Sequence, residues 1–125
     1  MNKEQLHNTA KAMVQKGKGI LAADESTPTC NKRFDNIGVD PTENNRNIYR
    51  DLLFTTNGME EFISGVILFD ETLRQSTISN GTPFPEYLMG KGVIPGIKVD
   101  KGAKELASHS GEKVTEGLDD LRDRL

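Results

Sequence analysis

Three short apolar stretches, each followed at once by charged residues, limit what this chain can fold into. Residues 19–26 read GILAADES, residues 64–72 read SGVILFDET, and residues 95–102 read PGIKVDKG. Apolar runs of this length are typical of strands buried in a sheet. Because a charged side chain is costly inside a core, each strand is expected to leave the core where its charges begin.

Two other stretches have apolar residues at helical intervals. They cover residues 3–16 and 42–56, and Thr42 is a suitable N-cap for the second helix. The expected buried stripe of this second helix consists of Ile48, Leu52 and Leu53. Strands separated by helical segments usually pair in parallel through right-handed crossovers. The sequence therefore predicts an α/β fold built on a parallel sheet.

The remaining segments carry weaker signals. Residues 25–41 contain two prolines and a glycine, and we expect them to be largely irregular, with at most one or two helical turns in residues 31–37. A polar loop is expected after the third strand. The chain closes with EGLDDLRDRL, in which three leucines mark the beginning of an amphipathic helix: Leu118, Leu121 and Leu125.

Length and composition indicate the number of domains and disfavour some classes of protein. A chain of 125 residues matches the usual size of one domain. Its formal net charge of −3, with lysines and arginines scattered along the chain, gives no reason to expect a nucleic-acid partner. No apolar run is long enough to cross a membrane, and the N-terminus lacks the apolar region of a signal peptide. We therefore expect a cytoplasmic protein.

The cysteine and histidine content bears on redox chemistry and metal binding. The single cysteine, Cys30, allows no internal disulfide and suits a reducing compartment. Because the only histidines are His7 and His109, the sequence shows no metal site built on histidine and cysteine. Cys30 is expected to be a loop residue rather than a nucleophile, because neither histidine lies near it in the sequence.

Charged residues at the ends of parallel strands indicate a ligand site. In parallel α/β folds the carboxyl ends of the strands form the ligand-binding edge. Lys98 lies inside an apolar run, and strand alternation places it with Asp100 on the face opposite its two immediate neighbours. A lysine in this position needs a carboxylate or an anionic ligand beside it. A structural ion pair with an aspartate remains the alternative to a functional lysine.

The loop after the first strand has the composition of a phosphate site. Residues 25–33 read ESTPTCNKR and offer the hydroxyls of Ser26 and Thr29 beside the basic Arg33. Hydroxyl groups, backbone amides and cations at a strand-to-helix turn suit a phosphate group. An ordinary polar loop has the same composition and remains the alternative.

Longer strings of the sequence resemble a known family. The strings GKGILAADESTPTCNKRF, PTENNRNIYRDLLFTT, ISGVILFDETLRQ, GVIPGIKVDKG and GLDDLRDRL occur in this order in class I fructose-bisphosphate aldolases, so the chain resembles that family from about Lys11 to Leu125. The resemblance implies a (β/α)8 TIM barrel that reversibly cleaves fructose 1,6-bisphosphate into dihydroxyacetone phosphate and glyceraldehyde 3-phosphate. It also implies a Schiff-base mechanism without a metal or another cofactor, and a homotetramer for full-length members.

Two residues carry the catalytic part of the resemblance. Asp24 resembles the first-strand aspartate that, in the family, works with the C4 hydroxyl as the C3–C4 bond breaks. Lys98 resembles the third-strand lysine that pairs with this aspartate and helps to hold the C6 phosphate. The charges at the ends of these two strands are therefore expected to meet at the substrate.

Four further residues match substrate-binding positions of the family. Ser26 and Thr29 correspond to hydroxyl residues that contact the same phosphate. Arg33 and Arg46 correspond to basic residues implicated in substrate binding. The family loop is expected to read STGS, whereas this chain has STPT, so Pro28 replaces a glycine. Proline fixes φ and removes a backbone donor, which leaves one N–H fewer for a phosphate.

The last residues of the chain correspond to the helix after the third strand of the family's barrel. Only about the first three β/α units are therefore expected. In the family, the Schiff-base lysine, the glutamate that transfers protons, another active-site lysine and the residues that hold the C1 phosphate all come from later strands. Residues 1–125 are expected to form a single incomplete barrel domain, a fragment of a longer aldolase that does not catalyse by itself.

The alternative is a short non-catalytic relative that binds a sugar phosphate or a protein partner. A metal-dependent aldolase is disfavoured, because the sequence shows no ligand cluster and its motifs match the Schiff-base family.

Overall fold

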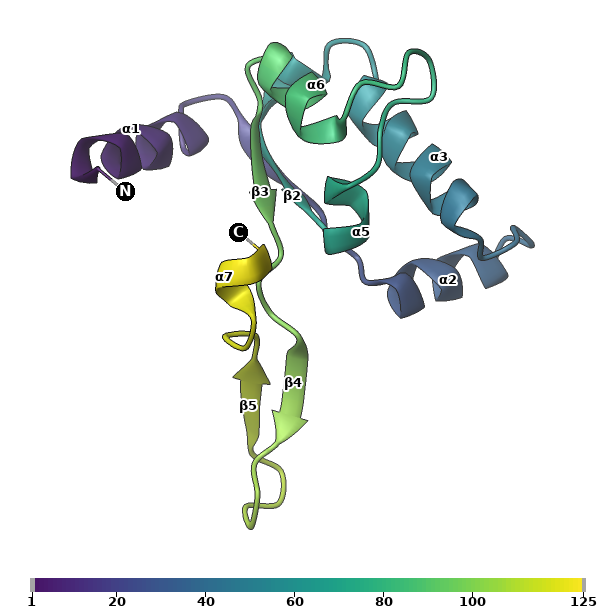
Figure 1. Ribbon diagram of the computed structural model, residues 1–125, viewed down its shortest axis with the longest axis vertical. Helices are drawn as coiled ribbons and strands as arrows, with labels where there is room; N and C mark the ends of the chain where they lie inside the picture. The colour runs from purple at the N-terminus through teal and green to yellow at the C-terminus, as the bar shows by residue number, and fades with distance from the viewer. Residues whose placement is uncertain (1, 125) are drawn as a thin grey trace.

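The computed structural model describes residues 2–124 and is organised around a three-stranded parallel sheet (Figure 1). The strands are β1 (Gly19–Ala23), β2 (Ile63–Leu68) and β3 (Ile94–Ile97), in the spatial order β1-β2-β3. Both strand pairs are parallel. The predicted parallel α/β arrangement is confirmed, because each crossover contains helix, as such pairing requires.

Helices cover one face of this sheet. They include α3 (Glu43–Thr55), α5 (Asp70–Leu73) and α6 (Phe84–Gly90), and Figure 1 shows α3 and α5 on the side of the sheet opposite α1 (Lys3–Met13). A short helix, α4 (Met59–Phe62), leads into β2. The core on this face joins strand residues to helix residues: Ala23, Val66, Leu68, Phe54, Phe84 and Leu88.

The N-cap of α3 was predicted correctly, but its buried stripe was not. The Thr42 hydroxyl accepts a hydrogen bond from the Asn45 N–H at 3.1 Å. Two of the residues expected inside are exposed, Ile48 at 47% and Leu52 at 66%, and only Leu53 packs against the core. The buried residues of α3 are Arg50 and Phe54 instead. Apolar spacing could not identify this face, because an arginine lies on it.

The other face of the sheet carries an apolar row that remains accessible. Ala22, Ile67 and Gly96 are paired side by side across the three strands. Ile20, two residues earlier in β1, is 44% exposed. Since side chains alternate along a strand, this accessible face continues to Asp24 after β1 and to Lys98 after β3.

Helix α2 (Thr27–Asp35) occupies most of the segment that was predicted to be largely irregular. Ser26 is its N-cap, and Pro28 lies in the first turn. Proline is tolerated there, because the first N–H groups of a helix have no intrahelical partner. The residue interpreted as a helix breaker therefore belongs to the beginning of a helix.

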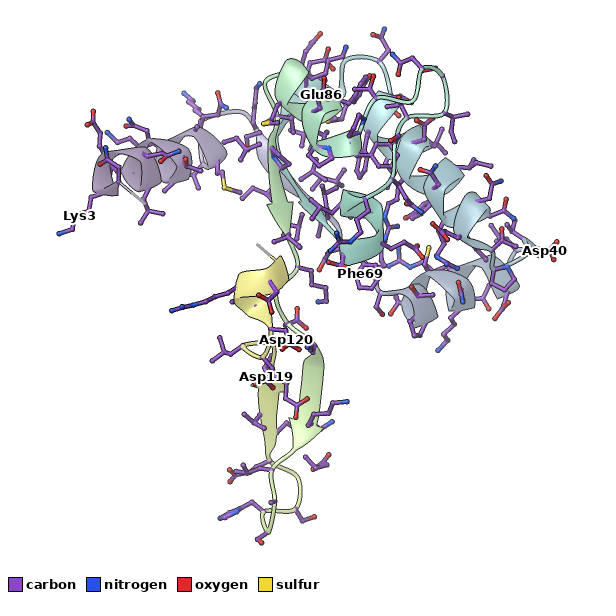
Figure 2. All side chains as sticks on the ribbon, in the orientation of Figure 1. Lys3, Asp40, Phe69, Glu86, Asp119 and Asp120 are labelled. Carbon is purple, nitrogen blue, oxygen red and sulfur yellow. The ribbon has the colours of Figure 1, made fainter. Side chains whose placement is uncertain are left out.

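A β-hairpin replaces the polar loop that was expected after the third strand. Strands β4 (Gly102–Glu105) and β5 (Lys113–Glu116) pair antiparallel and extend away from the sheet. Figure 2 shows their side chains projecting outward on both sides of the hairpin. Most of these residues are exposed, so the segment has no apolar alternation that could have indicated strands.

The last helix begins later than predicted. Helix α7 spans Leu121–Arg124, and Leu118 lies before it and is exposed. The prediction for Leu125 falls outside the described residues. Across residues 2–124, no helix combines the length and the apolar character required to cross a bilayer.

Candidate active site

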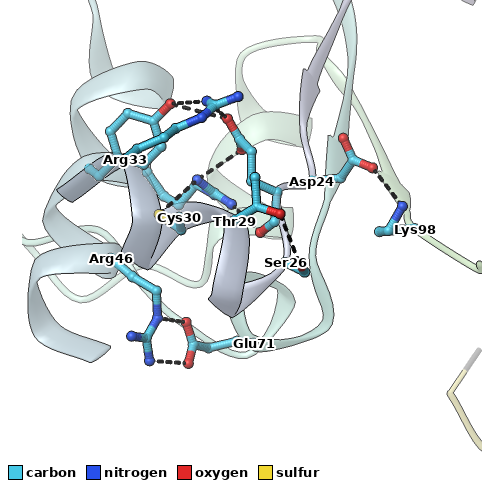
Figure 3. Close-up of polar contacts among 11 residues, drawn as sticks. Asp24, Ser26, Thr29, Cys30, Arg33, Arg46, Glu71 and Lys98 are labelled. Carbon is cyan, nitrogen blue, oxygen red and sulfur yellow. Dashed lines mark hydrogen bonds and ion pairs between the residues drawn. The ribbon is translucent and has the colours of Figure 1, made fainter. Parts of the chain in front are cut away.

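An ion pair joins the ends of the first and third strands. Lys98 Nζ lies 3.4 Å from Asp24 Oδ2, and the two side chains meet on the accessible face of the sheet (Figure 3). Both are about three-quarters buried, with 24% and 25% of their side-chain surface exposed. Strand alternation accounts for the meeting, because both residues lie an even number of positions from the exposed row. The predicted proximity of these two residues is therefore confirmed.

Lys98 has a second carboxylate partner, Asp100. Its ammonium donates a hydrogen bond to Asp100 Oδ2, while Oδ1 of the same carboxylate accepts the Gly102 N–H at 3.1 Å. The hydrogen bond between the two side chains is the main cause that raises the pKa of Lys98 and lowers the pKa of Asp100. Lys98 is consequently a cation, and Asp100 an anion, throughout the neutral range.

These groups line a cavity of about 630 Å³ at the carboxyl ends of the strands. Asp24 follows β1, Asp70 follows β2 and Lys98 follows β3, so all three strands contribute to it. The lining contains four carboxylates and two ammonium groups: Asp24, Glu25, Asp70, Asp100, Lys98 and Lys101. This is the edge of a parallel sheet at which ligands bind in α/β proteins.

Two hydroxyl groups enter the same cavity from the beginning of α2. Ser26 and Thr29 both line it, and their side-chain oxygens are 3.2 Å apart. The Ser26 hydroxyl makes no capping hydrogen bond to the backbone of α2. Both hydroxyls can therefore donate to an anionic group placed between α2 and Lys98.

The two predicted arginines lie outside the cavity lining. Arg33 is 57% exposed and pairs with the Glu25 carboxylate. Arg46 forms a two-pronged ion pair with Glu71, from Nε to Oε1 at 2.7 Å and from Nη2 to Oε2 at 2.8 Å. The structure thus brings together Asp24 and Lys98 with the two hydroxyls, whereas both guanidinium groups are engaged by neighbouring carboxylates. The substrate-binding roles expected of Arg33 and Arg46 stay predictions.

Sequence reasoning missed a buried arginine that holds the turn after β1. Arg50 is 2% exposed, and its Nη1 lies 3.0 Å from Glu25 Oε2. Its Nη2 donates to the Glu25 carbonyl oxygen at 2.9 Å, and the Tyr49 hydroxyl donates to the Glu25 carboxylate at 3.2 Å. Glu25 stands between Asp24 and Ser26, so these contacts fix the backbone that presents both residues. An arginine one helical turn before Phe54 was the available signal.

Cys30 is buried behind this turn. Burial raises the pKa of its thiol, which keeps the sulfur in the unreactive protonated form at neutral pH. In residues 2–124, no group of three or more histidine, cysteine, aspartate and glutamate side chains is arranged to hold a metal ion.

A match to a protein-family model shows the family to which this chain belongs. Residues 5–125 match the model described as Fructose-bisphosphate aldolase class-I. The chain belongs to the class-I fructose-bisphosphate aldolase family. The resemblance inferred from the sequence strings is thereby confirmed over nearly the whole chain.

Curated relatives of this family extend well beyond the matched region. A Xanthomonas campestris protein named "Probable fructose-bisphosphate aldolase class 1" is 59% identical over 125 residues, which are 100% of this chain and 37% of the relative. The cytosolic fructose-bisphosphate aldolase 7 of Arabidopsis thaliana is 58% identical over 118 residues, covering 94% of this chain and 33% of the relative. The chain therefore spans about a third of the length of these aldolases.

A solved aldolase structure has the same fold. The Plasmodium falciparum fructose-bisphosphate aldolase, crystallised with TRAP and a small-molecule inhibitor, matches with a TM-score of 0.90 and 55% identity over 97% of this chain and 35% of its own. This likeness confirms the predicted TIM-barrel fold class. The sheet β1-β2-β3, with its helices, represents the first three β/α units of such a barrel.

Proposed function

We propose that this chain supplies the first-strand and third-strand part of a class-I fructose-bisphosphate aldolase active site. The reaction is the reversible cleavage of fructose 1,6-bisphosphate into dihydroxyacetone phosphate and glyceraldehyde 3-phosphate. The proposal depends on one observation: Asp24 and Lys98, 3.4 Å apart, face a cavity at the carboxyl ends of the parallel strands. A structural ion pair alone does not require a cavity beside it.

Asp24 and Lys98 have complementary roles in this proposal. The Asp24 carboxylate takes the proton of the C4 hydroxyl as the C3–C4 bond breaks, acting as a positioned base. The Lys98 ammonium compensates the charge of this carboxylate and contacts the C6 phosphate. Ser26 and Thr29 donate hydrogen bonds to the same phosphate from the beginning of α2. Their position on the cavity wall, with hydroxyls 3.2 Å apart, supports this assignment.

The remaining groups of the mechanism are proposed to lie outside these 125 residues. In the family, the Schiff-base lysine, the proton-transferring glutamate and the C1-phosphate residues come from later strands. Without the amine there is no iminium to accept electrons from the breaking bond. We therefore expect no cleavage by residues 1–125 alone, which we regard as one incomplete barrel domain.

Three further features follow from the family assignment as proposals. The complete enzyme works without a metal or another cofactor, assembles as a homotetramer, and acts in the cytoplasm. The Arabidopsis relative is named a cytosolic aldolase, which supports the proposed cytoplasmic location. Arg33 and Arg46 are proposed to assist substrate binding from outside the cavity wall.

A chimeric enzyme tests this function. Residues 1–125 are joined to the remainder of the Xanthomonas campestris relative, to which they are 59% identical. The chimera is expected to cleave fructose 1,6-bisphosphate, measured by coupling the triose phosphates to a dehydrogenase. Asp24→Asn and Lys98→Met are each expected to lower kcat/KM by about 10²-fold or more, since they remove a proton-transfer group and a phosphate contact.

Glu105→Gln is the matched control. Glu105 also pairs with a lysine, Lys113 at 3.7 Å, but on the exposed hairpin away from the cavity. Its replacement should leave kcat/KM unchanged. A folded chimera without activity, or full activity in Asp24→Asn, would contradict the proposal and favour a non-catalytic sugar-phosphate-binding relative.

A further inference from the structure

The Lys98 ammonium contacts two carboxylates, one at the end of β1 and one on its own strand end: Asp24 and Asp100. Asp24 Oδ2 is 3.4 Å away across the sheet, whereas Asp100 lies two residues along the same chain and accepts a hydrogen bond from Lys98. Asp100 is therefore the closer of the two partners. Lys98 and Asp100 both line the cavity, so this contact lies where a ligand of the cavity meets the lysine.

The Asp100 carboxylate is held in place from both sides. Its Oδ1 accepts the backbone N–H of Gly102 at 3.1 Å, at the first residue of β4, while its Oδ2 faces Lys98. An aspartate bonded to the backbone two residues later has little freedom to turn away. Its orientation toward Lys98 is thus built into the beginning of the hairpin.

The charges around the cavity determine how the Lys98–Asp100 contact affects the binding of an anion. The lining carries four carboxylates and two ammonium groups. Arginines outside the lining pair with Glu25 and with Asp70, so Asp24 and Asp100 remain to compensate the cavity's two lysines. Lys101 also has a carboxylate nearby, Asp120 at 3.8 Å. A phosphate dianion approaching this cavity therefore meets lysines whose charge is already compensated.

We propose that Asp100 is an internal competitor for the anionic ligand: it occupies Lys98 and gives up that hydrogen bond when a phosphate group binds. This inference rests on the proposed function, in which Lys98 contacts a phosphate. Breaking the Lys98–Asp100 hydrogen bond lowers the affinity for any phosphate group that contacts Lys98, whether the phosphate is free or attached to a sugar.

Phosphate titration of the 125-residue chain tests whether the Asp100 charge lowers the affinity for phosphate. The chain is labelled with ¹³C and ¹⁵N, and inorganic phosphate is added at constant ionic strength while the amide shifts of Ser26 and Thr29 are followed. Asp100→Asn keeps an oxygen acceptor for the Gly102 N–H but removes the negative charge. We expect its Kd for phosphate to fall about two- to fivefold, the range that a partly exposed ion pair of this kind implies. The Lys98 pKa, measured from its ¹³Cε shift, should fall in the same variant.

Two controls separate competition at Lys98 from a change in net charge. Glu105→Gln removes one negative charge from the exposed pair on the hairpin and should leave both the Kd and the Lys98 pKa unchanged. Lys98→Met should weaken binding, and adding Asp100→Asn to it should bring no gain.

Three results would overturn the inference. Asp100→Asn could bind phosphate no more tightly than the original chain, or Glu105→Gln could show the same increase in phosphate affinity. The third is that neither the original chain nor Asp100→Asn binds phosphate. The chimera reports on the function separately. Its dependence on Asp24 and Lys98 can persist whatever the sign of the Asp100 effect.

Discussion

The two faces of the parallel sheet differ in what they bury. On the helix-covered face, Ala23, Val66 and Leu68 have no exposed surface. On the other face, Ile20 in the same strand as Ala23 remains 44% exposed, and the row ends in the Asp24–Lys98 pair. Parallel sheets are normally covered on both faces, which explains why the strands are continuously apolar. The comparison teaches that stability is concentrated on one face and the candidate chemistry on the other.

The largest expected loss of stability comes from the buried ion pair in the helical layer. Arg50→Met removes the buried guanidinium from the Glu25 carboxylate, which keeps only the more exposed Arg33 as a cationic partner, and breaking such a buried pair costs up to about 3–5 kcal/mol. Urea unfolding followed by circular dichroism measures the change. The double variant Glu25→Gln with Arg50→Met should recover part of it, because no unpaired charge is then buried. Equal losses in the single and double variants would mean that packing, not charge, is responsible.

A matched pair of truncations compares the two faces directly. Leu68→Ala removes a fully buried side chain and is expected to lower the free energy of unfolding by about 2–5 kcal/mol. Ile20→Ala, on the accessible face, should cost about 1 kcal/mol or less, since much of its side chain is already in water. Similar costs for both in urea unfolding would show that the second face is covered in solution, for example by self-association.

A smaller effect is expected at the beginning of α3. Thr42→Ala removes the hydroxyl that accepts the Asn45 N–H, and loss of such a cap costs about 1 kcal/mol. Thr42→Ser keeps the hydroxyl and is the conservative control. If both variants unfold at the same urea concentration as the original chain, the cap contributes nothing measurable.

The smallest effect concerns the partly exposed Lys98–Asp100 ion pair at the cavity and appears as a pH dependence of stability. The hydrogen bond from Lys98 lowers the pKa of Asp100. Its stabilising contribution is therefore present above the unfolded pKa of aspartate, about 3.9, and is lost as pH falls through the lower folded value. The stability difference between the original chain and Asp100→Asn should shrink below about pH 4. A difference that stays constant from pH 7 to pH 3 would contradict this.

The side-chain positions at the strand ends were partly predictable. Alternation along β3 was sufficient to group Asp100 with Lys98. The meeting of Asp24 and Lys98 was expected from the charges at the ends of parallel strands and from the family resemblance, not from alternation alone. The hydroxyls of Ser26 and Thr29 followed from their position directly after β1.

Other features depended on contacts that a local pattern does not contain. Arg50 is buried because Glu25, 25 residues earlier, compensates its charge, and residue type alone would place an arginine outside. The hairpin was missed because its strands bury little on either face. Pro28 was misjudged because proline ends a helix at most positions but suits its first turn.

The parallel register has a consequence for how this sequence can change. Ala22, Ile67 and Gly96 lie in one row, and Lys98 follows two positions after Gly96. Inserting or deleting a single residue between Gly96 and Lys98 would swing the ammonium toward the Phe54–Phe84 side and away from Asp24. A single substitution in this strand keeps the alternation of its side chains, whereas a one-residue insertion or deletion separates Lys98 from Asp24.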